Sequence, residues 1–83
     1  MNKTNTTYSI GAVANIVGIP KYKLRNWCDR YLTHIQKIEI GNTQHRRFTD
    51  ADVKIIKRID QLMNDGHTLK SAADKSIKQY KEG

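Results

Sequence analysis

Two short stretches of the sequence carry side chains whose chemistry suits nucleic acid. One is His45-Arg46-Arg47, which follows a Gly-Asn turn signal, and the other is the polar face of the segment from Lys21 to Tyr31. Guanidinium groups bind phosphates and guanine edges through paired N–H donors, whereas amides and phenols contact base edges and the sugar–phosphate backbone. The two stretches therefore predict a surface that contacts a polyanion. For the helical face, a solvated polar surface is the alternative.

The segment from Lys21 to Tyr31 predicts a helix with one buried face and one polar face. Its apolar residues recur at i, i+3, i+4 and i+7, and they are Leu24, Trp27, Cys28 and Tyr31. At about 100° per residue, the opposite face collects Tyr22, Arg25, Asn26 and Asp29, with Lys23 and Arg30 on its flank. Asp29 has the wrong charge for a polyanionic partner, unless it orients Arg25 from one turn away.

The stretch from Ile38 to Phe48 predicts a β-hairpin that leads directly into a helix. Ile38 and Ile40 alternate with polar residues, and the hairpin tip falls near residues 41–44, where glycine and asparagine favour a turn. Successive strand residues alternate faces, so Arg46 and Arg47 cannot both point the same way. We expect Phe48 to point into the core while Arg46 and one neighbour point outward. Such a hairpin would act as a wing that presses cations against nucleic acid.

The remaining elements are predicted helices. Ser9 can cap a first helix whose apolar positions are Ile10, Val13, Ala14 and Val17, and Gly18 ends it. The short turn to the second helix fits a helix-turn-helix. Thr49 and Asp52 form a capping box for a third helix that Gly66 ends, with the apolar residues Val53, Ile55, Ile56, Ile59, Leu62 and Met63. Thr68 caps a fourth helix with the stripe Leu69, Ala72, Ala73, Ile77 and Tyr80.

The size and charge of the chain define what kind of domain it can form. Its 83 residues allow one domain, which we place at residues 8–83 after a loose polar tail at residues 1–7. The net charge is +7, and the excess is greatest in residues 1–31, where five Lys/Arg accompany one Asp. A basic chain favours a polyanionic partner, because phosphate neutralisation dominates non-specific affinity for nucleic acid.

Other classes of function find little support in the residues. The single cysteine, Cys28, fits a reducing compartment and lies on an inward face, so we expect a small buried hydrophobe rather than a metal ligand or thiol sensor. The histidines His34, His45 and His67 share no ligand spacing, and we expect no metal or other cofactor. The pattern contains no nucleophile arrangement, carboxylate pair or phosphate loop, so an enzyme is not expected. The polar N-terminus lacks the apolar core of a signal peptide, and no apolar run is long enough to span a bilayer. We therefore expect a cytoplasmic protein.

In the order and spacing of these elements, the chain resembles the DNA-binding domain of the MerR superfamily of bacterial winged-helix regulators. The matching residues extend over roughly 8–75. They are Tyr8-Ser9-Ile10-Gly11-Ala12-Val13-Ala14, Gly18-Ile19, Leu24-Arg25-Asn26-Trp27, His45-Arg46-Arg47-Phe48-Thr49, Asp52-Val53, Leu62 to Gly66, and Thr68-Leu69. The basic, aromatic-ended hairpin is most similar to small members without an effector domain.

This resemblance implies a mainly α winged helix-turn-helix with about four helices and a two-stranded hairpin. It implies that the second helix enters the major groove, with Arg25 at the arginine position of the family, and that the hairpin follows the backbone or minor groove. The chain departs from the family at Pro20, where a serine or threonine usually caps this helix, and at Asn26 and Cys28, where tyrosine and glutamate are common. These differences bear on the DNA sequence that is read.

The predicted function is therefore double-stranded DNA binding by a nucleoid-associated transcription regulator. The predicted contacts are Lys21, Tyr22, Lys23, Arg25, Asn26 and Arg30 for the major groove and its flanking phosphates, and Gln44, His45, Arg46 and Arg47 for the hairpin. Arginine in a narrow minor groove would add a preference for A·T-rich DNA.

Several alternatives stay open at this point. The chain could be the DNA-binding head of a segregation or architectural protein, or an excisionase. It could be a minimal protein or the head of a longer one, it could act as a homodimer or assemble cooperatively on DNA, and a partner protein could bind near its C-terminus. From a different class, a protein- or membrane-interaction module is suggested by the four lysines of the last helix, Lys70, Lys75, Lys78 and Lys81. Its slight apolar stripe argues against membrane binding.

Overall fold

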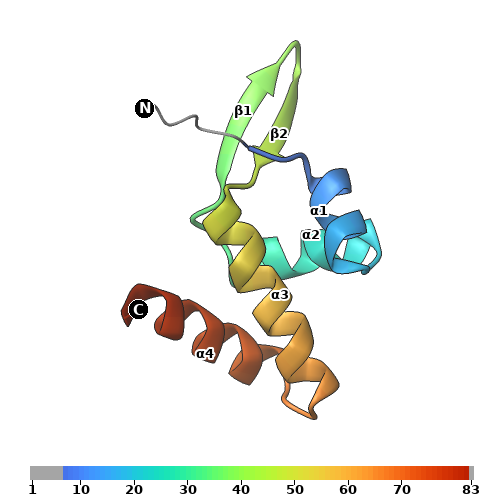
Figure 1. Cartoon of the computed structure of the whole chain (residues 1–83). Helices are drawn as coiled ribbons and strands as arrows, with labels where there is room; N and C mark the ends of the chain where they lie inside the picture. Colours follow the sequence, from blue (N-terminus) through green and yellow to red (C-terminus); the bar gives the residue numbers. More distant parts are fainter. Residues whose placement is uncertain (1–6, 83) are drawn as a thin grey trace.

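The computed structural model describes residues 7–82, with side chains described through residue 79. In this part of the chain the elements follow in the order α1 (Ile10–Val17), α2 (Lys21–Arg30), β1 (Gln36–Ile40), β2 (Thr43–Arg47), α3 (Asp50–Asn64) and α4 (Leu69–Glu82). Figure 1 shows the helices forming one body from which the hairpin projects. The predicted class, mainly helical with a two-stranded antiparallel hairpin, is confirmed.

The turn between α1 and α2 follows from local chemistry. The Ser9 hydroxyl accepts a hydrogen bond from the Ala12 N–H at 3.2 Å, which satisfies one of the free donors at the start of α1. Gly18 ends the helix at φ 86°, a left-handed conformation that glycine adopts without steric cost, and its N–H donates to the Ala14 carbonyl. Two residues later, Pro20 caps α2 without a side-chain hydrogen bond. The predicted helix-turn-helix connection is therefore present.

The core lies where the helices converge on the base of the hairpin. α1 packs on both α2 and α3, and it also contacts β2. The largest fully buried side chains come from every part of this arrangement, and they are Trp27, Phe48, Leu24, Leu32, Ile56, Ile59, Val13 and Cys28. The apolar periodicity of α1, α2 and α3 thus predicted the inward faces correctly.

The hairpin of β1 and β2, residues 36–47, is called the wing from here on. Gly41 at φ 64° and Asn42 form its two-residue turn, and Ile40 pairs with Thr43 across it. β1 begins at Gln36, two residues before the predicted start at Ile38. Phe48 is fully buried, as predicted, and its backbone exchanges hydrogen bonds of 2.8 and 2.9 Å with Tyr8. This short bridge ties the N-terminal segment to the base of the wing.

α3 and α4 form the second half of the body. The predicted capping box is present, because the Thr49 hydroxyl accepts from the Asp52 N–H at 3.2 Å and the Asp52 carboxylate accepts from the Thr49 N–H at 2.9 Å. α4 packs on α3 through Ala72 and Ala73, both fully buried, whose small side chains permit a close approach. The predicted position of the Tyr80 side chain lies outside the described side chains.

Candidate nucleic-acid interface

The exposed face of α2 presents the residues that the sequence predicted for it. Leu24, Trp27 and Cys28 point into the core. Tyr22 is 74% exposed, and Lys21, Arg25, Asn26 and Arg30 are exposed beside it. Within residues 7–79, none of the five makes a side-chain hydrogen bond or ion pair, so their donors are available to a ligand.

Lys23 differs from its neighbours on α2. It is half-buried, and its ammonium group lies 5.7 Å from the centre of the Trp27 ring, within the range of a cation–π contact. The contact keeps this charge at the flank of the helix. Lys23 therefore fits a contact with a flanking phosphate better than a contact with a base.

Arg46 does not point outward, and that prediction was wrong. Its side chain is 17% exposed, and its guanidinium forms an ion pair with Asp29 of α2. The register of the wing places Arg46 opposite Lys37, on the face that looks toward α2. Asp29 compensates this charge across the gap. Asp29 therefore has Arg46 as its partner, and it does not orient Arg25, which was the one condition under which its charge would have suited a recognition face.

Arg47 lies on the other face of the wing, which confirms that the two arginines point in different directions. Its Nε atom donates to the Thr7 hydroxyl at 3.1 Å, and a terminal nitrogen donates to the Thr7 carbonyl at 3.0 Å. Thr7, the last residue of the predicted loose tail, is thus held by the fold. Residues 1–6 of that tail lie outside the described residues.

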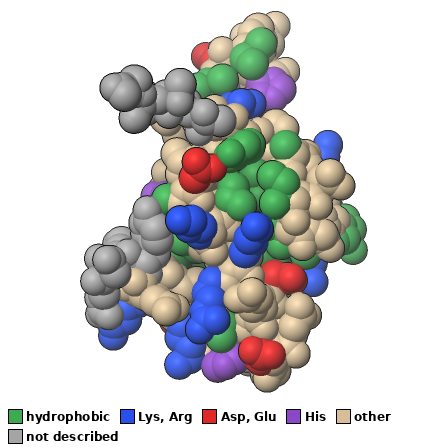
Figure 2. Space-filling view, viewed as in Figure 1, with side chains coloured by type: hydrophobic (Ala, Val, Ile, Leu, Met, Phe, Trp, Pro, Cys, Tyr) green, Lys and Arg blue, Asp and Glu red, His purple; other side chains and the backbone are tan. Residues whose placement is uncertain are grey.

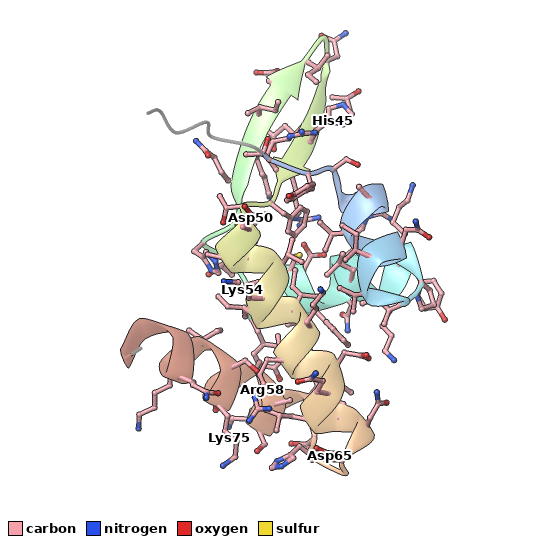
Figure 3. All side chains as sticks on the ribbon, in the orientation of Figure 1. His45, Asp50, Lys54, Arg58, Asp65 and Lys75 are labelled. Atoms are coloured by element: carbon pink, nitrogen blue, oxygen red, sulfur yellow. The ribbon has the colours of Figure 1, made fainter. Side chains whose placement is uncertain are left out.

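The inner face of the wing and the start of α2 enclose a cleft of about 370 Å³, called the α2–wing cleft. It is lined by Ser9, Ile10, Lys21, Arg25, Lys37, Thr43, Gln44, His45 and Arg46. The structure therefore brings five predicted contact residues around one opening, and one of them, His45, lies exposed on the wing (Figure 3). The other five predicted residues, Tyr22, Lys23, Asn26, Arg30 and Arg47, do not line the cleft.

Lys37 is a cation of this cleft that the sequence reading missed. A two-residue turn at Gly41 and Asn42 sets the register of the hairpin, and that register pairs Lys37 with Arg46. Directly opposed residues of antiparallel strands project from the same face. Counting outward from the turn would therefore have placed Lys37 beside Arg46.

The thiol of Cys28, on the inward face of α2, is buried and unreactive. Cys28 is 2% exposed, and burial raises the pKa of its thiol to about 11, while the positive charges of Arg46 and Lys37 oppose that rise. A thiol with so high a pKa is protonated at neutral pH and is a poor nucleophile or metal ligand. Its burial agrees with the predicted role as a small hydrophobe. Within the described residues, no group of three or more His, Cys, Asp or Glu side chains could hold a metal ion.

The fold and the cleft together define a winged helix-turn-helix with a basic face. The sequence matches the family model described as MerR HTH family regulatory protein over residues 8–76, and the chain belongs to this family. The structure is similar to the crystal structure of HiNmlR, a MerR family regulator lacking the sensor domain, bound to promoter DNA, with a TM-score of 0.71 and 30% sequence identity.

That similarity covers 87% of this chain and 56% of HiNmlR, so the chain spans little more than half of that relative. The comparison with curated proteins gives no match. Among the described residues, none of the helices combines the length and the apolar character needed to cross a bilayer.

Proposed function

We propose that this chain binds double-stranded DNA as a transcription regulator. In this proposal α2 enters the major groove while the wing lies along the adjoining backbone or minor groove. The observation that carries it is the α2–wing cleft, where Lys21 and Arg25 from one element face Lys37, His45 and Arg46 from another. In a DNA duplex, the phosphate backbone separates the major groove from the minor groove. One backbone segment could therefore accept hydrogen bonds from both sets of donors at once.

The residues of α2 divide into two roles. Arg25 and Asn26 lie on the exposed face and carry the groups that hydrogen-bond base edges, a guanidinium for guanine and an amide for adenine. Lys21, Lys23 and Arg30 supply cations to the flanking phosphates, and the Tyr22 hydroxyl adds a further donor. The free N–H groups at the start of α2, which Pro20 leaves without a side-chain cap, are suited to one more phosphate.

The wing contributes in a different manner from that first expected. Gln44 and His45 are exposed and would contact the sugar–phosphate backbone directly. Arg46 and Arg47 are half-buried, so their first role is to set the position of the wing. Only those N–H donors that stay exposed at the surface of the wing would reach DNA. The preference for A·T-rich DNA stays a prediction, and it requires Arg46 to leave its ion pair with Asp29 and enter a narrow minor groove.

HiNmlR is bound to promoter DNA in its structure, which supports the same ligand class for this chain. The proposal places the protein on the nucleoid in the cytoplasm. A homodimer or a cooperative assembly would require paired half-sites on the DNA. The number of protein chains bound per selected duplex therefore distinguishes these assemblies from a monomer.

Selection of bound duplexes from fragmented bacterial DNA tests the proposal. The affinity of the recovered pool would then be compared with that of random DNA at two salt concentrations. We expect a defined motif that binds at least about 10³-fold more tightly than random DNA, the range typical of specific binders.

Two other results would change the account. A steep salt dependence without a preferred sequence would identify a segregation or architectural DNA-coating head instead of a regulator. An absence of binding at low salt would contradict DNA binding altogether.

A further inference from the structure

A second opening, called the α3–α4 groove, lies between the last two helices. Its volume is about 320 Å³, and it is lined by Lys54, Ile55, Arg58, Ser76 and Gln79. It shares no lining residue with the α2–wing cleft. Among the described elements α4 packs on α3 alone, and Figure 1 shows it on the side of α3 away from α1 and α2. The groove is therefore a separate feature of the molecule.

The groove concentrates positive charge that has no partner in the described part of the chain. Lys54 and Arg58 are exposed on successive turns of α3, where their like charges repel each other. Neither forms an ion pair with a side chain of residues 7–79. Asp50, one turn before Lys54, accepts instead from the Tyr8 hydroxyl at 2.7 Å. None of the lining residues is acidic.

The surroundings of the groove are basic as well. Figure 2 shows lysine and arginine side chains gathered over α3 and α4 on this face. Figure 3 places Lys54 and Arg58 along α3 and Lys75 on the neighbouring α4. An anion bound in the groove would relieve the repulsion between the cations of α3.

A buried hydroxyl provides an independent sign of a ligand. Ser76 is 2% exposed, and its Oγ atom has no hydrogen-bond partner among the described residues. Buried polar groups are usually paired, so an orphaned hydroxyl on the wall of a groove calls for an explanation. Gln79, one turn further along α4, places an amide, which carries N–H donors, on the same wall.

We propose that the α3–α4 groove binds the phosphate group of a small molecule, at a site distinct from the DNA interface. Arg58 offers paired N–H donors, Lys54 a point charge, and Ser76 and Gln79 two neutral donors. A carboxylate has two oxygens and would leave part of this set unpaired, whereas a phosphate presents three or more. The bound phosphate bridges α3 and α4, so it stabilises the packing of α4 on the body.

Titration of ¹⁵N-labelled protein with inorganic phosphate, at constant ionic strength maintained with chloride, tests the site. We expect saturable shifts at Lys54, Arg58, Ser76 and Gln79. Arg58→Gln should weaken the apparent affinity by about tenfold or more, since hydrogen bonds to charged groups are the strong ones. The control is Lys57→Gln, which removes an exposed cation of α3 outside the groove and should leave the affinity unchanged. Shifts that fail to saturate, or equal affinities in the two variants, would overturn the proposal.

A second variant separates ligand binding from a merely structural role. Ser76→Ala removes a buried, unpaired hydroxyl, so the variant should be at least as stable as the parent in the absence of phosphate. Its phosphate affinity should nevertheless fall. A variant that binds phosphate as well as the parent would show that Ser76 is only a core residue and that no built site exists.

The affinity for DNA distinguishes a small-molecule phosphate from a phosphate of the DNA backbone as the ligand of the groove. Arg58→Gln should bind the selected duplex as tightly as the parent does, with the same salt dependence. If that variant loses affinity for the duplex and the slope against salt falls by about one, the groove holds a backbone phosphate of DNA. That result would contradict a separate small-molecule site while leaving DNA binding intact.

Discussion

α2 and the wing are both basic, yet their arginines are held in opposite ways. Arg25 on α2 is exposed and makes no side-chain hydrogen bond within residues 7–79. Arg46 and Arg47 on the wing are half-buried, and each has an intramolecular partner, Asp29 for the first and Thr7 for the second. The difference shows that the fold leaves the guanidinium of Arg25 available to a ligand, whereas it uses those of Arg46 and Arg47 to hold the wing in position.

Replacement of Arg25 should have the largest effect on DNA binding. We expect Arg25→Ala to cost about 1–3 kcal/mol on the selected duplex and to relax the preference at one base pair, as the loss of a base contact does. The measurement is the affinity for that duplex and for a set of single-base variants. An equal loss of affinity on every duplex would instead show that Arg25 contacts a phosphate. Arg25 would then differ from the arginines of the wing only in its exposure, and not in reading a base.

Arg47 should act mainly on stability. Its two hydrogen bonds to Thr7 are half-buried, so Arg47→Ala should lower the free energy of unfolding by about 0.5–1.5 kcal/mol. Chemical denaturation measures this loss. Gln44→Ala, at an exposed position of the same strand, is the control and should leave stability nearly unchanged. A stable Arg47→Ala protein that binds DNA poorly would show that Arg47 contacts DNA and does not merely hold the wing.

The ion pair between Arg46 and Asp29 should show a small but measurable coupling. Asp29 is 57% exposed, so a double-mutant cycle in unfolding free energy should give about 0.2–1 kcal/mol, the usual range for a solvent-exposed pair. Arg46→Ala should also weaken DNA binding, because it leaves the Asp29 charge unpaired near phosphates. Additive effects of the two single variants on DNA affinity would contradict the bracing role.

Lys37 should make the smallest contribution, and one that depends on salt. If Lys37, which lines the α2–wing cleft, neutralises one phosphate of the DNA, the Lys37→Gln variant should show a slope of log affinity against log salt that is smaller by about one. Its sequence preference should stay the same. Lys70→Gln on α4, an exposed cation outside both openings, is the control. An unchanged slope would remove Lys37 from the interface.

Local signals predicted most of the fold, because the elements here are specified by local chemistry. The apolar period of α2 predicted that Leu24, Trp27 and Cys28 are buried, and the capping box at Thr49 marked the start of α3. The Gly-Asn turn located the tip of the wing.

The candidate site was only partly predictable, because side-chain direction in the wing depends on distant partners. Asp29 lies 17 residues from Arg46 in sequence, and Thr7 lies 40 residues from Arg47. No local period relates such residues. Ser76 escaped notice for a similar reason, since a serine on α4 is buried only because α3 packs over it.

The most direct test of the account is a map of the residues that change when the selected duplex binds. Amide and side-chain shifts of ¹⁵N-labelled protein should concentrate on the exposed face of α2 and on Lys37, Gln44 and His45 of the wing, while the α3–α4 groove stays unaffected. Shifts concentrated on α3 and α4, with α2 unperturbed, would contradict the claim that α2 and the wing form the DNA-binding surface.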